Sequence, residues 1–194
     1  MKTPTSLKRT LAAAAFGLIA VQGAFAQETT EEVPADISAA LEQSAAIANN
    51  SAFGGWIVNC EAITVNSTSC RLIQQLSRTE DNSLIVRMVV VPAGDGTHLM
   101  IAQTPSGVYL PGGAVYRFAE NEEVEQREMI WQRCIGDTCE AAARLDAEEL
   151  ALFDANATLL FGYRPDVTSE PIIVPMDISQ FGEAIAALNL SQQN

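Results

Sequence analysis

The residues of this chain that could most readily do chemistry are four cysteines, which stand at Cys60, Cys70, Cys134 and Cys139. Paired thiols can form disulfides, whereas four thiolates can bind a zinc ion. The first pair encloses nine residues and the second pair four, and these spacings differ from the short zinc knuckle. In an exported chain, an even number of cysteines therefore predicts two disulfides rather than a metal site.

Each cysteine pair flanks its own predicted turn, and this placement favours local pairing. Cys60 and Cys70 lie symmetrically about Val65, so a hairpin that turns there places them opposite each other. A hairpin over residues 135–138 does the same for Cys134 and Cys139. We predict these two local bridges, and a bridge between the two hairpins is the alternative, because β-sandwiches can carry an inter-sheet disulfide.

His98 is the only histidine, so a Ser–His–Asp or Cys–His catalytic site would have to include it. It stands at the start of a predicted strand beside a tight turn, where an exposed polar residue is ordinary. The chain contains no G-x-S-x-G, P-loop or H-E-x-x-H motif. We therefore predict no catalytic residues and no enzyme. The alternative is a hydrolase with an unrecognised site around His98 and nearby carboxylates.

The densest acidic cluster comprises Glu120, Glu122, Glu123 and Glu125. A calcium site needs oxygen ligands that converge on one point, usually through an Asp, Asn and Gly spacing that this run lacks. A solvated hairpin tip is the better interpretation. The sequence thus predicts no metal and no cofactor.

The best candidate for a binding loop is the segment 105–113, which reads PSGVYLPGG. Proline and glycine shape the backbone there, and loops on a rigid scaffold commonly carry binding residues. The alternative is an ordinary turn, which uses the same residue types. The candidate contact residues are Pro105, Gly107, Tyr109, Leu110 and Gly112.

Residues 1–26 have the pattern of a signal peptide. Two lysines and an arginine precede an apolar run, and Ala24-Phe25-Ala26 matches a cleavage site. We expect the mature chain to begin at Gln27 and to be periplasmic or secreted. The apolar run is too short for a membrane span, which needs about 20 residues, and no later segment is long and apolar enough.

The mature chain is strongly acidic. Removal of the leader takes away three of eleven cationic residues, so a formal net charge of −13 becomes −16 over 168 residues. Such acidity argues against nucleic acid and anionic membrane surfaces as partners. We expect an unknown protein or envelope partner, and the charge favours a basic one.

The elements that must position these residues are mostly short strands separated by turn signals. An almost entirely apolar run at 84–91 predicts a central strand buried on both faces. Prolines keep the last strand at an edge. A capping box at Asp146 and Glu149 predicts a helix over 147–153, and Asp177 is the expected cap of a final helix. The other predicted strands cover 56–61, 70–76, 98–103, 114–118, 129–134, 139–145, 158–163 and 171–176.

These elements predict a mainly β domain over residues 54–190. Its fold is expected to be an antiparallel β-sandwich or open barrel with one or two short helices, stapled by disulfides. Residues 27–53 are expected to form a flexible or partly helical N-terminal arm, with a short helix over 36–50, and residues 191–194 a tail.

Five segments of the chain carry a recognisable pattern in their order and spacing: WIVNC from residue 56, CRLIQQ from residue 70, PSGVYLPGGAVYRF from residue 105, CIGDTCEA from residue 134 and PMDISQFGEAIAAL from residue 175. Together they resemble the invasion-associated locus B family of exported bacterial proteins. Thr138 stands where the family usually has glycine, and Gln180-Phe181 replaces a Gly-Phe pair, so the resemblance is weaker at these two turns. The resemblance implies an exported, disulfide-bearing β domain without catalytic residues to carry over, linked in some pathogens to entry into host cells.

The residues and the resemblance together predict an exported, non-enzymatic binding or interaction protein of the bacterial envelope or host interface. The hydrolase around His98 is the first alternative. The second is an envelope chaperone or structural protein that offers a sheet edge to its clients by strand addition.

Overall fold

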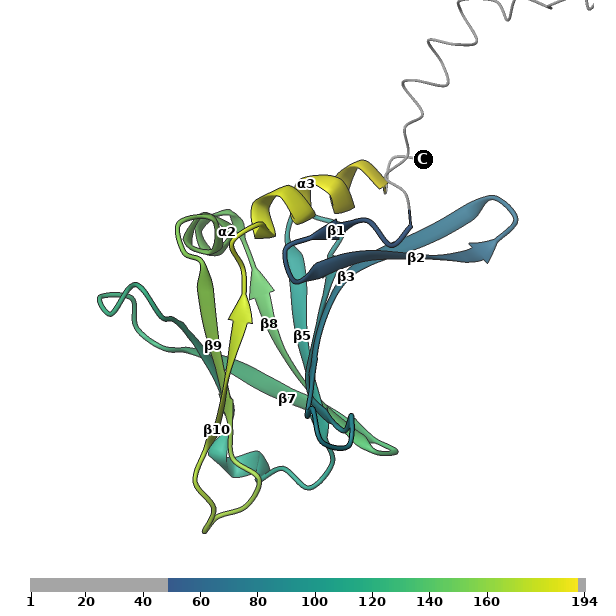
Figure 1. Ribbon diagram of the computed structural model, residues 1–194. Helices are drawn as coiled ribbons and strands as arrows, with labels where there is room; N and C mark the ends of the chain where they lie inside the picture. The colour runs from purple at the N-terminus through teal and green to yellow at the C-terminus, as the bar shows by residue number, and fades with distance from the viewer. Residues whose placement is uncertain (1–48, 192–194) are drawn as a thin grey trace, which may run out of the picture.

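Ten strands form one continuous antiparallel sheet in the computed structural model, which describes residues 49–191 (Figure 1). Most strands are slightly longer than predicted, whereas the predicted bounds of 114–118 and 158–163 are confirmed. The helical elements are η1 (Leu110–Gly112), α2 (Ala147–Asp154) and α3 (Phe181–Ser191). The strands are β1 (Ala52–Phe53), β2 (Trp56–Thr64), β3 (Ser67–Ser77), β4 (Leu84–Pro92), β5 (His98–Pro105), β6 (Ala114–Phe118), β7 (Arg127–Ile135), β8 (Thr138–Leu145), β9 (Thr158–Tyr163) and β10 (Ile172–Asp177).

The strand order is β1-β2-β3-β4-β5-β8-β7-β6-β9-β10, so the sheet is not closed and its edges are β1 and β10. The sheet bends back on itself, and Figure 1 shows β9 and β10 facing β3 and β5 across the interior. Strand β7 connects the two facing parts of the sheet, because it pairs with β8 on one side and with β6 on the other. The predicted mainly β fold, an antiparallel sandwich or open barrel, is confirmed as one antiparallel sheet that does not close, and β10 lies at an edge as its prolines indicated.

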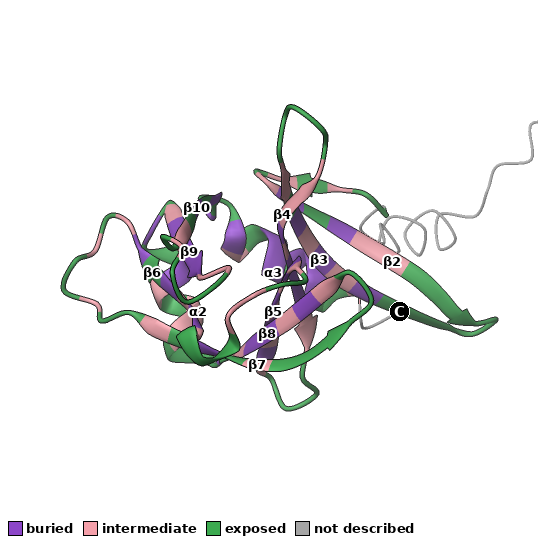
Figure 2. Cartoon of the chain, turned by 90° about the horizontal axis from the view of Figure 1, so that it is seen from below, coloured by how far each residue is buried: buried purple, intermediate pink, exposed green. Residues whose placement is uncertain are grey.

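The interior is filled by alternate residues of each strand, because successive side chains of a strand point to opposite faces. In β4, Val86 and Met88 are fully buried, and Figure 2 shows buried positions recurring along the strands. On the outer face of the same strand, Arg87 and Val91 are only half-buried. Val89 of the same outer face is buried, so the prediction that 84–91 is buried on both faces is confirmed at this residue and wrong at Arg87 and Val91, which reach solvent.

Helix α2 begins where the sequence predicted, and Asp146 caps it by accepting a hydrogen bond from the backbone N–H of Glu149 (2.9 Å). The Glu149 carboxylate departs from the expected capping box. It accepts hydrogen bonds from the hydroxyl of Tyr116 (2.7 Å) and from Nε of Arg127 (3.3 Å). Burial and the hydrogen bond to this carboxylate raise the pKa of Tyr116. The helix is thereby tied to β6 and β7.

Helix α3 begins at Phe181 rather than directly after Asp177, which corrects the predicted cap. The Asp177 carboxylate accepts hydrogen bonds from the backbone N–H (3.0 Å) and the hydroxyl (2.7 Å) of Ser179, so it caps the turn that precedes the helix. These hydrogen bonds lower the pKa of Asp177. The apolar residues with which this segment packs on the barrel are all buried: Ile178, Phe181, Ile185 and Leu188.

A row of aromatic side chains closes the end of the barrel that the helices cover. Phe181 of α3 packs against Trp56 of β2 and Phe153 of α2, with ring centroids 5.1 and 4.5 Å apart. Phe153 also contacts Phe118 of β6 at 5.3 Å, and all four rings are buried. Both helices lie over this end in Figure 1, whereas turns and η1 form the opposite end.

The described β domain includes a few residues that the sequence assigned to the N-terminal arm. Ala52 and Phe53 form β1 and pair with β2. The Asn49 side chain donates to the carbonyl of Cys60 (3.0 Å) and accepts from its N–H (2.8 Å). At the other end, Ser191 is the last residue of α3. The predicted leader, most of the predicted helix and residues 192–194 lie outside the described residues and stay predictions.

Candidate functional site

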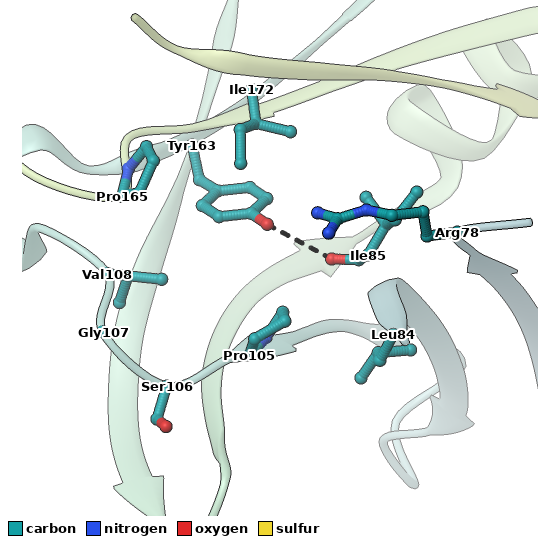
Figure 3. A pocket seen from close by; sticks show the side chains of 10 residues that line it. All are labelled: Arg78, Leu84, Ile85, Pro105, Ser106, Gly107, Val108, Tyr163, Pro165 and Ile172. Atoms are coloured by element: carbon teal, nitrogen blue, oxygen red, sulfur yellow. Dashed lines mark hydrogen bonds between the residues drawn. The ribbon is translucent and has the colours of Figure 1, made fainter. Parts of the chain in front are cut away.

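A pocket of about 370 Å³ lies at the end of the barrel away from the helices (Figure 1). We refer to it as the open-end pocket, and its lining side chains are shown in Figure 3. Its volume lies in the range of small-ligand sites, about 300–1,000 Å³. Three connections form it: the β3–β4 turn, the loop after β5 and the β9–β10 turn. The residues that line it are Arg78, Leu84, Ile85, Pro105, Ser106, Gly107, Val108, Tyr163, Pro165 and Ile172.

Backbone hydrogen bonds to other hairpins hold the loop after β5 in place. The N–H of Ser106 donates to the carbonyl of Asp137 (2.8 Å) in the β7–β8 turn. The N–H of Tyr109 donates to the carbonyl of Arg164 (2.8 Å), which follows β9. Between them, Gly107 has a φ of +96°, a conformation that favours glycine. Hydrogen bonds therefore hold this loop at Ser106 and Tyr109, and between them the backbone turns at Gly107, where a positive φ favours glycine.

The β3–β4 turn supplies the only charged side chain among the lining residues. The N–H of Arg78 donates to the carbonyl of Ser83 (2.8 Å), and the Asp81 carboxylate accepts from the N–H of Ser83 (3.0 Å). Figure 3 shows the Arg78 guanidinium reaching into the pocket toward Tyr163. Within the described part of the chain, Arg78 forms no ion pair at 4.0 Å or less. None of the residues that line the pocket is acidic, so Arg78 is the one charged group of the lining, with Asp81 of the same turn interacting with it from outside the lining.

Tyr163 is buried against the pocket and links two strands across the barrel. Its hydroxyl donates to the carbonyl of Ile85 (3.3 Å), which joins β9 to β4 (Figure 3). Burial raises the pKa of Tyr163, and the positive charge of Arg78 opposes this in part. The phenol therefore stays neutral at physiological pH. The site combines apolar walls with one guanidinium, an arrangement that suits an apolar group bearing an anionic substituent.

The structure brings only part of the predicted binding loop to this pocket. Pro105 and Gly107 line it, whereas Tyr109, Leu110 and Gly112 do not. Gly112 lines a separate hollow of about 230 Å³, and the Leu110 side chain is 48% exposed. Binding by the loop stays a prediction, and only the first residues of the loop line this pocket.

Sequence reasoning missed the pocket residues outside that loop, chiefly Arg78, Leu84, Tyr163 and Ile172. Each stands at or beside the end of a strand, where its residue type is ordinary. Arg78 and Leu84 flank the β3–β4 turn, and Tyr163 and Ile172 pair in the β9–β10 hairpin. The two hairpins meet because the sheet bends back on itself, which no local pattern records. The only local signal is the turn that follows Arg78.

Both predicted disulfides, Cys60–Cys70 and Cys134–Cys139, are present, and each joins two Cα atoms 4.0 Å apart. Each bridge links directly opposed residues of one hairpin, β2–β3 or β7–β8. The bridges are local because the register of each hairpin places its two cysteines opposite each other. The alternative bridge between hairpins is therefore excluded.

The second disulfide lies in the hairpin that supports the pocket loop. Gly136 has a φ of +57° at the first of two turn residues, as a type II′ hairpin turn requires. The turn is followed by Thr138, which pairs with Pro105, and by Cys139, which pairs with Thr104. The bridge thus adjoins the point at which β5 becomes the pocket loop.

His98 is buried, with 3% of its surface exposed, which corrects the expectation of an exposed side chain. Its side chain points from β5 into the barrel and lies beneath α3. The Nε2 atom of His98 is 3.0 Å from Oδ1 of Asn189 in that helix. Its Nδ1 has no hydrogen-bond partner. Among the residues described, neither a carboxylate nor a hydroxyl nucleophile is hydrogen-bonded to His98. The charge relay that a hydrolase would need is not assembled there.

The acidic run after β6 has a structural contact. The Glu120 carboxylate accepts a hydrogen bond from the N–H of Thr158 (3.2 Å), at the start of β9, and the pKa of Glu120 is lowered by this contact. Across residues 49–191, no three His, Cys, Asp or Glu side chains gather as metal ligands. The same residues include no helix that is long and apolar enough to span a membrane.

Fold and site together define an open β barrel that is stapled by two disulfides, covered by helices at one end and hollowed by a ligand-sized pocket at the other. The family model of the Invasion associated locus B (IalB) protein matches residues 56–189, which is more than half of the chain. The chain belongs to this family, as the resemblance of its segments indicated.

A solved structure shows the same fold. The chain is similar to the crystal structure of invasion associated protein b from Bartonella henselae, with a TM-score of 0.63 and 20% sequence identity. The match covers 74% of this chain and 96% of that chain. No curated protein sequence matches the chain.

Proposed function

We propose that this protein is an extracytoplasmic, non-enzymatic binding protein whose open-end pocket holds an apolar group of an envelope or host-surface partner. The observation that carries this proposal is the Arg78 guanidinium, which reaches into an otherwise apolar pocket without an ion-pair partner among the described residues. Two disulfides support a location outside the cytoplasm, because such bonds persist in oxidising compartments. The IalB family, whose members are exported bacterial proteins, supports it as well.

The pocket chemistry sets the class of ligand and its affinity. About five buried methylene groups would contribute about 4 kcal/mol. A charge-assisted hydrogen bond from Arg78 to a carboxylate would add about 1.5–3 kcal/mol. Association entropy offsets part of this sum, so we expect a dissociation constant on the order of 10⁻⁴ M for a small amphiphile. A larger partner that presents the same group would bind more tightly through additional contacts.

The test is an NMR titration of the full chain with decanoate and, in parallel, with the uncharged 1-decanol. We expect decanoate to shift the resonances of Val108, Tyr163 and Ile172. The Arg78→Gln variant should bind decanoate roughly 10–100-fold more weakly, while its affinity for decanol should be unchanged. Arg117→Gln, which removes an exposed arginine of β6 outside the pocket, is the matched control. Equal decanoate affinity of the two variants would refute the proposal.

The other two functions are less well supported. The hydrolase would need His98, which lies beneath α3 at the other end of the barrel. A chaperone that adds a client strand would need a free sheet edge. At one edge, β10 carries Pro175, which has no N–H to donate, and at the other edge β1 is only two residues long. The net charge also led us to expect a basic partner. That partner stays a prediction, and it would bind to the acidic surface outside the pocket.

A further inference from the structure

The outer face of the sheet carries a continuous apolar row that the folding core does not use. Antiparallel sheets with one solvated face usually place polar side chains on that face. Here the strand register aligns one aliphatic residue from each of six neighbouring strands. At the two ends of the row, Ile57 is 43% exposed and Ile130 69% exposed. The row runs through Ile57, Ile73, Val89, Ile101, Ala142 and Ile130.

This row forms part of a groove. Val91 of β4 and Leu99 of β5 oppose each other two positions further along and widen the apolar floor. Hollows of about 530 and 330 Å³ lie on this face and share Ile101, Arg133 and Glu140, so they are parts of one depression.

Val89 and Ala142 are only 8% exposed, but Ile73 and Ile101 are half-buried and the two ends of the row are exposed, so apolar surface stays accessible along the depression. Accessible apolar surface of this kind marks an interaction site. We refer to it as the outer groove.

Positive charge gathers around the outer groove although the protein is acidic. Residues 49–191 contain nineteen acidic residues, eight arginines and no lysine. Four of those eight arginines line the two hollows, which places half of the positive side chains of this part of the chain on one face. They are Arg71, Arg87, Arg133 and Arg144.

These arginines remain able to bind incoming carboxylates. Arg71 pairs with Glu61, Arg133 pairs with Glu140 (2.7 Å), and Arg144 pairs with Asp95. The exposed Arg71–Glu61 and Arg144–Asp95 pairs contribute only about 0–1 kcal/mol, so a partner can replace them. The Glu140 side chain is only 18% exposed, so Arg133 keeps this carboxylate as a partner. Each guanidinium also has five N–H donors, and these pairs use only some of them. Arg87 donates to the Gln75 side chain (2.8 Å) and has no acidic partner among the described residues.

We propose that the outer groove binds a segment of another protein that is apolar along its centre and carries carboxylates along both sides. Charge complementarity selects this occupant, because four arginines border an apolar floor. A second copy of the chain fits less well, since it would oppose like-charged rims and join two molecules that each carry a net charge of −13. An anionic membrane is disfavoured by the same net charge. This surface is separate from the open-end pocket, and it stands whether or not the pocket binds a ligand.

The experiment uses the full chain and two synthetic amphipathic peptides with identical apolar faces, one flanked by glutamates and one by lysines. The glutamate peptide should bind, and its affinity should fall as salt is added. The lysine peptide should bind roughly tenfold or more weakly. Equal binding of the two peptides, or binding of neither, overturns the proposal. A dimer in sedimentation that dissociates when the groove is altered overturns it in favour of a second copy, and binding to anionic vesicles overturns it in favour of a membrane.

Two variants locate the binding and one controls for it. Ile130→Asp places a charge at an exposed end of the row, and Arg87→Gln removes the cation without an acidic partner. Each should reduce affinity for the glutamate peptide roughly tenfold. Val167→Asp, at a position 62% exposed in the β9–β10 turn, is the matched control and should leave it unchanged. Unchanged affinity of both groove variants, with folding verified by circular dichroism, overturns the assignment.

Discussion

Removing the Cys134–Cys139 bridge should weaken binding in the open-end pocket, whereas removing the Cys60–Cys70 bridge should not. The two perturbations are the double alanine variants of each pair. Alanine is preferred to serine because one cysteine of each pair is buried, with only 2% exposed, and a hydroxyl at such a position adds a desolvation cost. The two variants therefore control for each other.

The expected loss of stability follows from the length of each closed loop. The bridged cysteines are 5 and 10 positions apart in the sequence. In the chain-entropy relation, closed loops of about 6 and 11 residues correspond to about 2.2 and about 2.8 kcal/mol at 25 °C. Both values are below the usual stability of a domain, about 5–15 kcal/mol, so both variants should fold. The Cys60–Cys70 variant should be the less stable of the two.

The effect on binding should run in the opposite order. The β7–β8 turn supports the pocket loop, because Thr138 pairs with Pro105 and the carbonyl of Asp137 accepts from the N–H of Ser106. If about half of the lost free energy appears as disorder of this turn, decanoate affinity falls by about 1 kcal/mol, which is roughly fivefold. The Cys60–Cys70 hairpin contributes no residue to the pocket.

Urea unfolding followed by tryptophan fluorescence measures the stabilities, and the decanoate titration measures binding. Reduced wild-type protein should behave like the quadruple alanine variant, which controls for effects of substitution. The reasoning is refuted if both double variants lose the same affinity. It is also refuted if the Cys134–Cys139 variant keeps the wild-type affinity while its stability falls as expected.

Three further predictions concern single groups. His98→Ala should lower the free energy of unfolding by about 1–3 kcal/mol, because it removes the contact with Asn189, and should leave decanoate binding unchanged; loss of any turnover would instead favour an enzyme. Tyr163→Phe should cost about 1 kcal/mol in urea unfolding, and no loss would show that its hydrogen bond contributes nothing. Hydrogen bonds, first from Ser169, lower the pKa of Asp166 in the folded protein. This carboxylate therefore stabilises the fold above its unfolded pKa, and the stabilisation is lost as the pH falls below about 4. Asp166→Asn should make the melting temperature fall less steeply with decreasing pH in this range.

The disulfide framework and most strands could be predicted from sequence because their causes are local. A short hairpin has one register that opposes its cysteines, so Cys134 and Cys139 needed no knowledge of the rest of the fold. The bounds of β6 and β9 follow from turn residues on both sides. The cap of α2 at Asp146 is likewise set within one turn of helix.

The errors arise where residues distant in sequence decide the environment. His98 lies beside a turn, but Asn189 of α3 covers it. The run 84–91 is apolar for two different reasons: Val86 faces the core, whereas Val91 faces the outer groove. A continuous apolar pattern cannot distinguish a second packed layer from an exposed apolar row.

The open-end pocket could not be predicted for the same reason. Tyr163 and Ile172 are paired in the β9–β10 hairpin, whereas Arg78 follows β3, and only the bend of the sheet brings Arg78 to them. The predicted loop 105–113 begins at the pocket, because turn residues mark where a loop leaves the sheet, and binding by this loop stays a prediction. The pattern did not indicate that only its first residues face the pocket.

The most direct test of the central claim is the structure of the full chain in complex with decanoate. The account predicts that the carboxylate lies within hydrogen-bond distance of the Arg78 guanidinium, with the alkyl chain against Val108 and Ile172. Decanoate bound in the outer groove or beneath α3, with the open-end pocket empty at saturating ligand, would contradict it.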